Sequence, residues 1–213
     1  QRLTEKGLPM SRLALSLACG LALSQPLFAQ EFPALYDVTG VAAGDVLNVR
    51  TAPDAAADVI GALAPNQQNV EVTASNDDGS WGRVNIGKGT GWASLSFLAP
   101  QEGSAMPDAA EVTCFGTEPF WSYHVTPGGD ATWSAIDDEV ATMLAGPFRR
   151  ADARFEPFVS IAGGPDQQGV LVMQKDAECS DGMSDGLWGL SGTVVLTGAL
   201  SRAVSGCCSL EPQ

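Results

Sequence analysis

The stretch DVLNVRTAP at residues 45–53 decides the fold of the first half of this chain. The polar Asn48 and Arg50 alternate with the apolar Leu47 and Val49, which is the period of two that a strand shows when one face lies in a core. The proline at the end of the stretch stops the strand, because it has no N–H to give to a sheet ladder. The stretch therefore predicts a strand followed by a turn.

Similar short runs follow at intervals of about ten residues, and turn residues separate them. They read DVIGALA, QNVEVTAS, WGRVNI and WASLSFL, with the turns NDDGS and GKGTG between the later ones. Recurrent short strands without a helix are typical of a small antiparallel barrel. We expect its core to contain Leu47, Val49, Val59, Ile60, Leu63, Val70, Val72, Val84 and Ile86.

Residues 36–99 combine a Leu-Asn-Val-Arg strand, an Ala-Pro turn, a tryptophan before the fourth strand and a Gly-Trp pair near the end. In this combination the segment resembles the bacterial SH3-like family. The resemblance implies a small β-barrel that commonly binds peptidoglycan or its stem peptides in the cell envelope. The positions that match the family pattern are Leu47, Asn48, Val49, Arg50, Pro53, Trp81, Val84, Gly91, Trp92 and Leu98.

The candidate ligand-binding residues of this half are Asn48, Arg50, Trp81 and Trp92. An indole offers a large rigid face on which a sugar or a peptide plane can stack, although both tryptophans could equally fill the ends of a small core. The Arg50 guanidinium could bind a ligand carboxylate through two parallel hydrogen bonds. Alternatively, it could pair with Asp54 or Asp58 and hold the turn.

The start of the chain has the pattern of a secretory signal peptide. An apolar run at residues 13–23 follows Arg12 and precedes the small residue Ala29, which predicts a start at Met10 and a signal peptide that ends at Ala29. The run is about half the ~20 residues that span a membrane, so we expect no transmembrane segment in the mature chain. Cys19 lies in a poor lipoprotein pattern, so we expect an exported, periplasmic or extracellular protein without a lipid.

The charge balance is strongly acidic. The net charge is −14, and removal of residues 1–29 takes away three basic residues and one acidic residue and leaves −16. Such a surface repels phosphate groups, which argues against nucleic acid as a partner, and it attracts cationic proteins. High solubility is the alternative explanation of the same charge.

The cysteines divide the mature chain into two parts. Four remain after the signal peptide, all in the second half: Cys114, Cys179, Cys207 and Cys208. An even number in an exported chain predicts two disulfides, and with no CxxC pair and one histidine we expect no metal site. The polar, proline-containing stretch at residues 101–110 is the predicted linker between an SH3-like domain at residues 30–100 and a cysteine-containing domain at residues 111–213.

The second domain also has the pattern of an antiparallel β structure. Its runs predict six to eight strands in a barrel or sandwich, so the fold class of the chain is all-β with two small barrels. Cys207 and Cys208 are adjacent and point to opposite faces of a strand, so each needs a different partner. If the last strand closes the barrel against the first, one of the pair bridges Cys114 and the other Cys179.

Three motifs of this domain carry a second resemblance. The stretches CFGTEPFW, CSDGMSD and SGCC, within residues 111–210, resemble an uncharacterised family of small exported or membrane-anchored bacterial proteins. The resemblance implies no particular activity. The candidate site residues of this half are Glu118, Trp121, Asp181 and Asp185.

The CSDGMSD stretch at residues 179–185 could be a metal loop, a catalytic loop or a tight turn. Its acids have the wrong spacing for a calcium loop, which alternates oxygen ligands and ends on a bidentate acid. The two Asp-Gly pairs favour turns, because glycine accepts positive φ and an aspartate can bind N–H groups two residues on. We therefore expect a structural loop.

The leading hypothesis is a non-enzymatic exported envelope protein, without a cofactor, whose SH3-like module binds peptidoglycan or a peptide. The first alternative is an inhibitor or regulator that captures a basic envelope enzyme such as a lysozyme through the acidic surface. A small cysteine-pinned barrel is similar in architecture to bacterial lysozyme inhibitors. The second alternative is a hydrolase that uses carboxylates of the second domain, which the sequence supports least because nothing sets the distance between them.

Overall fold

The computed structural model describes residues 31–210, so the predicted signal peptide lies outside the described part of the chain. The described residues form strands and turns, and the helix among them is one short 3₁₀ turn, η1 at Leu95–Phe97. This confirms the all-β fold class. The described residues fall within a single compact unit.

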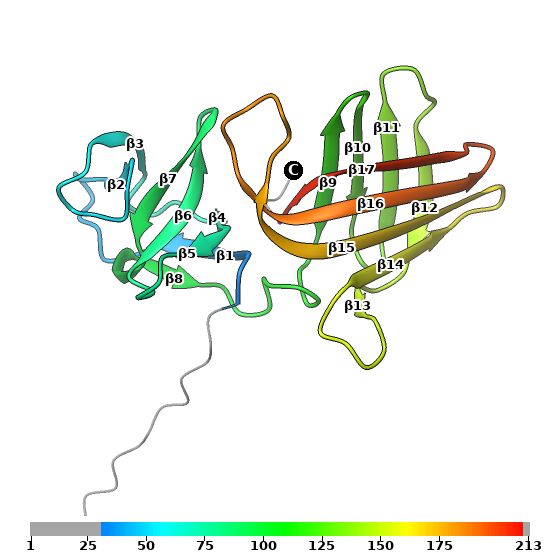
Figure 1. Cartoon of the computed structure of the whole chain (residues 1–213). Helices are drawn as coiled ribbons and strands as arrows, with labels where there is room; N and C mark the ends of the chain where they lie inside the picture. The colour runs from blue at the N-terminus through cyan, green and yellow to red at the C-terminus, as the bar shows by residue number, and fades with distance from the viewer. Residues whose placement is uncertain (1–30, 211–213) are drawn as a thin grey trace, which may run out of the picture. The chain divides into compact units, whose positions relative to one another are not determined.

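The first half consists of two antiparallel sheets (Figure 1). In the smaller sheet, β1 (Ala34–Val38) lies between β4 (Val70–Val72) and β8 (Leu98–Pro100). The larger sheet has the order β3-β2-β7-β6-β5. Its strands are β2 (Leu47–Arg50), β3 (Val59–Leu63), β5 (Ala74–Ser75), β6 (Trp81–Ile86) and β7 (Gly89–Ser94).

Side chains from both sheets form the core of this half. The buried apolar residues are Ala34, Tyr36, Val38, Leu47, Val49, Leu63, Val70, Val72, Val84, Ala93, Leu95 and Leu98, and Ile86 packs against them. The core prediction was wrong at Val59 and Ile60, which are 51% and 46% exposed. Both lie on β3, the edge strand of its sheet, where a register shift opposite Val49 and Arg50 interrupts the regular alternation of faces.

Gly91 on β7 is a point of close approach between β7 and its neighbours. A Cβ at this position would lie 2.5 Å from Cγ1 of Val49, 2.9 Å from Cδ1 of Ile60 and 3.0 Å from the carbonyl oxygen of Arg50. The core residue Val49 and the backbone of β2 therefore occupy the space that a side chain would need. This is a physical reason for the Gly-Trp pair in the sequence.

We predict that Gly91→Ala destabilises the protein by about 1–3 kcal/mol, the usual cost of forcing an extra carbon into a packed core. The measurement is urea unfolding followed by tryptophan fluorescence. Gly44→Ala is the matched control, because a Cβ at Gly44 meets nothing within 4 Å. Equal stability of the two variants would contradict the packing argument.

The second half is a closed antiparallel barrel of eight strands, taken in chain order around the ring. Its strands are β9 (Val112–Thr117), β10 (Phe120–Val125), β11 (Asp130–Ala135), β12 (Ala141–Ala145), β14 (Phe158–Gly163), β15 (Gln167–Cys179), β16 (Trp188–Gly198) and β17 (Arg202–Ser209). The short β13 (Arg149–Arg150) pairs with β14 beside the ring. The last strand, β17, pairs with the first, β9, and so closes the barrel.

The barrel interior is a packed core. It includes Trp121, Tyr123, Trp133, Phe158, Leu171, Met173, Leu190 and Leu196, all 5% exposed or less. The rings of Trp121 and Trp133 stack with their centroids 5.7 Å apart. Burial raises the pKa of Tyr123 to about 12, so this phenol stays neutral.

Two disulfides form at the closing strand, which confirms the predicted bridges. Cys208 pairs with Cys114, its direct neighbour across the β17–β9 ladder, and Cys207 pairs with Cys179 at the end of β15. The adjacent cysteines point to opposite faces, as their alternation on a strand requires. The disulfides close loops of 94 and 28 residues, which lowers the conformational entropy of the unfolded chain. By this argument each disulfide stabilises the folded state by about 3–5 kcal/mol.

The segment at residues 101–110, which the sequence suggested as a linker, packs against the protein. Met106 and Ala109 are 2% and 4% exposed and belong to the barrel core, and Leu35 of β1 reaches the same core. The Ser104 hydroxyl accepts the N–H of Leu35 at 3.0 Å. The predicted domain boundaries stay a prediction, but the segment between the two cores is anchored on both sides.

Candidate functional site

The sequence-predicted residues of the first half lie on one face of the five-stranded sheet. Asn48 and Arg50 alternate with the buried residues of β2, and Trp92 on β7 is the direct cross-strand neighbour of Arg50. Trp81 on β6 pairs with Ser94 on β7. All four candidates are only partly buried, so this is the outer face of the sheet.

Three of these four residues line a shallow open groove with a volume of about 280 Å³. Its remaining walls include Val46 and Phe97, which are 45% and 39% exposed. The full lining is Val46, Leu47, Asn48, Arg50, Ala55, Trp81, Ser94 and Phe97. The groove thus combines aromatic and aliphatic faces with one guanidinium and one amide, which suits a ligand with an apolar body and a polar or anionic end.

Arg50 also holds the turn that follows β2. Its Nη1 donates to the carbonyl oxygen of Ala57 at 2.7 Å. Among the ion pairs of residues 31–210, Arg50 pairs with neither Asp54 nor Asp58, and the Asp54 carboxylate accepts the N–H of Ala56. The side chain forms no ion pair among residues 31–210, so its other N–H groups can meet a ligand carboxylate.

Trp92 does not line the groove. It lies between Arg50 and Arg83 on neighbouring strands, at the centre of the outer face. Arg83 is 6% exposed and donates to Thr73, to the carboxylate of Glu178 and to the carbonyl of Ala177. The hairpin end of β6 and β7 on the outer face is therefore bound to the barrel, and the end with Asn48 and Trp81 is open.

The candidates of the second half are not gathered into one site. Trp121 is 5% exposed and lies in the barrel core, stacked on Trp133, so it packs the interior. Glu118 is exposed in the turn between β9 and β10. Cys114 is bridged to Cys208 and so has no free thiol that could act as a nucleophile.

Asp181 supports the fold of the CSDGMSD loop. Its Oδ1 accepts the N–H groups of Met183 and Ser184 at 2.9 and 2.8 Å, and its Oδ2 accepts the Ser184 hydroxyl at 2.8 Å. The buried indole N–H of Trp188 lies near the same carboxylate without a hydrogen bond of standard geometry. Asp185, by contrast, is exposed and binds the rest of the protein through its backbone.

The pKa of Asp181 lies below its ordinary value. Burial acts to raise this pKa, but the hydrogen bonds from Ser184 and Met183, with a contribution from Trp188, outweigh it. The ionised form is therefore the one that the loop binds. Its stabilising effect is present above the unfolded-state pKa of about 3.9 and is lost as the pH falls through the lower folded-state pKa.

We predict that Asp181→Ala lowers the free energy of unfolding at pH 7 by about 0.5–2 kcal/mol, the range for a lost capping side chain. The difference from the parent protein should shrink below about pH 4. Urea unfolding at several pH values measures both effects. Asp185→Ala is the control and should change little; a difference that is constant down to pH 3 would argue against the ionised cap.

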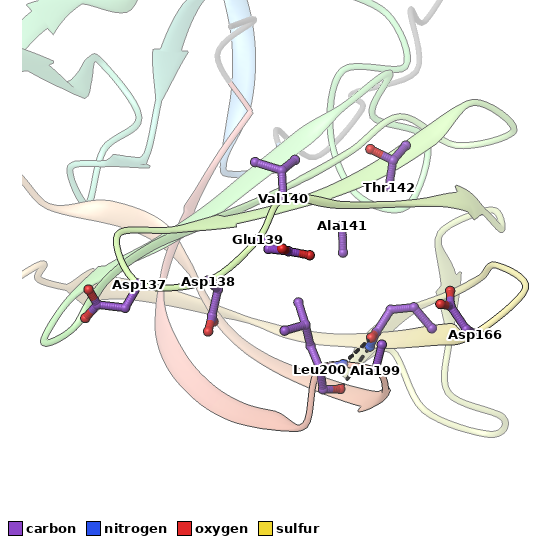
Figure 2. A pocket seen from close by; sticks show the side chains of 10 residues that line it. Asp137, Asp138, Glu139, Val140, Ala141, Thr142, Asp166, Ala199 and Leu200 are labelled. Carbon is purple, nitrogen blue, oxygen red and sulfur yellow. Dashed lines mark hydrogen bonds between the residues drawn. The ribbon is translucent and has the colours of Figure 1, made fainter.

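A second hollow, which the sequence did not predict, lies at one end of the barrel (Figure 2). Its volume is about 480 Å³, and its lining comes from the turns β11–β12, β14–β15 and β16–β17. The acids around it are Asp137, Asp138, Glu139 and Asp166. The acidic run IDDEV at residues 136–140 was the only trace of this hollow in the sequence. The run alone does not indicate a site, because Asp166 joins it only in the folded barrel.

One of these acids is already compensated. Asp138 forms an ion pair with Arg202 and accepts the Trp133 indole N–H at 3.2 Å. The Arg202 contact lowers the pKa of this carboxyl. In the described part of the chain, Asp137, Glu139 and Asp166 form no ion pair, so the mouth of the barrel presents a negative field to solvent.

Comparison with known families supports the assignment of the first half. Residues 45–99 match the model of the bacterial SH3 domain. This is a binding domain, and its match is consistent with a non-enzymatic role and with a module of the cell envelope. No significant match was found among curated proteins or among solved structures, and the resemblance of the second half to an exported family stays a prediction.

Two further properties concern residues 31–210 alone. Within that range, no group of three or more His, Cys, Asp or Glu side chains is arranged to hold a metal ion. The same residues contain no helix with the length and apolar character that crossing a membrane requires.

Proposed function

We propose that this is an exported, non-enzymatic protein of the cell envelope whose SH3 domain binds peptidoglycan or a peptide in the open groove. The observation that carries this proposal is the convergence of Arg50, Asn48 and Trp81 on one groove beside the exposed Phe97. Stem peptides end in carboxylates, which a guanidinium fork binds, and sugar or peptide planes stack on an indole. The two disulfides agree with an oxidising compartment.

The proposal predicts that the purified protein sediments with isolated peptidoglycan or is retained by immobilised stem peptides. Trp81→Ala and Arg50→Lys should each weaken the binding about tenfold, through loss of stacking area and of the bidentate fork. The readout is the dissociation constant from a sedimentation titration, with circular dichroism to verify folding.

Matched controls are Phe155→Ala, an exposed aromatic residue outside the groove, and Arg149→Lys, an exposed arginine of the barrel. Both should bind like the parent protein. The proposal fails if the parent protein does not bind either material, or if the groove variants bind as well as the controls.

A second candidate function is capture of a basic envelope enzyme such as a lysozyme. The observation that favours it is the barrel mouth, where Asp137, Glu139 and Asp166 surround a hollow without an ion pair among the described residues. Charge attraction of this kind speeds association. It weakens with salt, because dissolved ions screen charges that lie farther apart than the Debye length of about 8–10 Å.

This second candidate predicts stoichiometric inhibition of lysozyme that weakens steeply between low and moderate salt. The triple variant Asp137→Asn, Glu139→Gln and Asp166→Asn should abolish the inhibition. The charge-matched control neutralises Asp77, Asp108 and Asp152, which are exposed elsewhere. Absence of inhibition by the parent protein, or equal loss in both triple variants, would rule out the mouth as a specific site.

A further inference from the structure

The covered end of the SH3 outer face binds a segment of the barrel, and the bonded atoms of that segment belong to its backbone. We call Asn85, Lys88, Gly89 and Thr90, at the β6–β7 hairpin, the hairpin strip. Residues 185–187, between β15 and β16, lie along it. The N–H of Asp185 donates to the carbonyl of Lys88 at 2.8 Å, and Asp185 forms a parallel bridge with Gly89.

Asn85 recognises both peptide groups of one residue. Its Oδ1 accepts the N–H of Leu187 at 3.0 Å, and its Nδ2 donates to the carbonyl of Leu187 at 3.2 Å. These are the two bonds that a neighbouring strand would make, here supplied by one side-chain amide.

Thr90 completes the recognition. Its hydroxyl oxygen accepts the N–H of Leu187 at 2.9 Å and lies 3.0 Å from the carbonyl of Asp185 and 2.8 Å from Oδ1 of Asn85. A hydroxyl has one proton, so it donates to one of these two acceptors at a time. These hydrogen bonds from the strip all go to the main chain of the bound segment.

The central residue of the segment is restricted in size. Gly186 is buried, and a Cβ there would lie 3.0 Å from Oγ of Ser184 and 3.6 Å from Oδ1 of Asn85. The tight contact is with Ser184 of the loop itself, so the glycine suits the turn of the loop, and the 3.6 Å to Asn85 is ordinary van der Waals contact. The strip itself accepts an extended backbone in which the N–H and carbonyl of one residue face Asn85.

The bound segment is held in place from its own side. The Asp181 carboxylate orders the loop, and the hydroxyl of Thr117 donates to the carbonyl of Asp181 at 2.8 Å. The Cys179–Cys207 bridge fixes its start. A tethered segment of this kind acts at an effective concentration in the millimolar range, far above that of a free peptide.

We propose that the hairpin strip is a peptide-binding site, distinct from the open groove, which residues 185–187 occupy in cis. Its ligand class is an extended peptide that is bound through its main chain by strand addition. The loop excludes such peptides from the native chain and leaves the groove as the accessible half of the face. This inference does not depend on what the groove binds.

The test uses the full chain and a dye-labelled peptide with the sequence of residues 183–188. The variant Asp185→Pro with Leu187→Pro removes both N–H donors of the loop and leaves the strip intact. Fluorescence anisotropy should show binding at least about tenfold tighter than to the native chain. Equal affinity for the native chain and the variant would overturn the proposal.

A further substitution in the proline variant tests the site itself. Asn85→Ala should remove the gained binding, whereas Gln168→Ala, which removes an exposed side-chain amide on β15 outside both the strip and the groove, should not. Peptide binding that survives Asn85→Ala would mean that the peptide binds elsewhere, and the proposal would fail.

If the proline variant does not fold, amide hydrogen exchange tests whether the strip holds residues 185–187. In the otherwise native chain, Asn85→Ala should speed exchange at the amides of Asp185 and Leu187 about tenfold, and Gln168→Ala should leave both rates unchanged. Unchanged exchange in Asn85→Ala would show that the strip does not hold the segment.

Discussion

The closure of the barrel by β17 is the constraint on which most of this structure depends. That strand pairs with β16 on one side and with β9 on the other, and its adjacent cysteines bridge to opposite faces. Cys208 joins the closing seam from inside, and Cys207 fixes the start of the loop after β15. Beyond the cysteines, Ser209 and the N–H of Leu210 bind the buried carboxylate of Glu71 in the SH3 half. One strand end thus seals the barrel, positions the loop and joins the two cores.

The outer face of the SH3 sheet is consequently divided in two. Arg83 and the hairpin strip bind the barrel, so the β6–β7 end of the face is used within the chain. The groove at Asn48, Arg50 and Trp81 stays open at the other end. A small module has little surface for a ligand, and here the barrel occupies one end of the outer face.

Local patterns in the sequence predicted much of this arrangement. The alternation around Leu47 and Val49, the turn chemistry of Asp181 and the opposite faces of Cys207 and Cys208 are properties of neighbouring residues, and the structure agrees with each. The convergence of Asn48, Arg50 and Trp81 on one groove could be anticipated only through the family resemblance. Val59 and Ile60 were assigned to the core because a bulge at an edge strand leaves no clear sign in the sequence.

The remaining features arise from contacts between distant segments, which periodicity cannot reveal. Met106 looked like part of a polar linker, yet it completes the barrel core. Asn85 belongs to the run WGRVNI, whose pattern predicts only a strand, and its partner Leu187 lies 102 positions away. The acidic mouth likewise requires the barrel to bring three separate turns together.

The pairing of the first and last barrel strands also sets the order in which the protein can fold. The strand β9, which carries Cys114, gains its second neighbour only when β17 pairs with it. The partner Cys208 on β17 lies 94 residues later in the chain. The strands of the SH3 half, from β1 to β8, all precede the barrel, so that half can form while the barrel is still an open sheet with two unpaired edges. Until β17 pairs with β9, those edges are exposed to pairing with other chains. The barrel is therefore prone to association with other chains until the last strand, which contains the Gly-Cys-Cys segment, closes it.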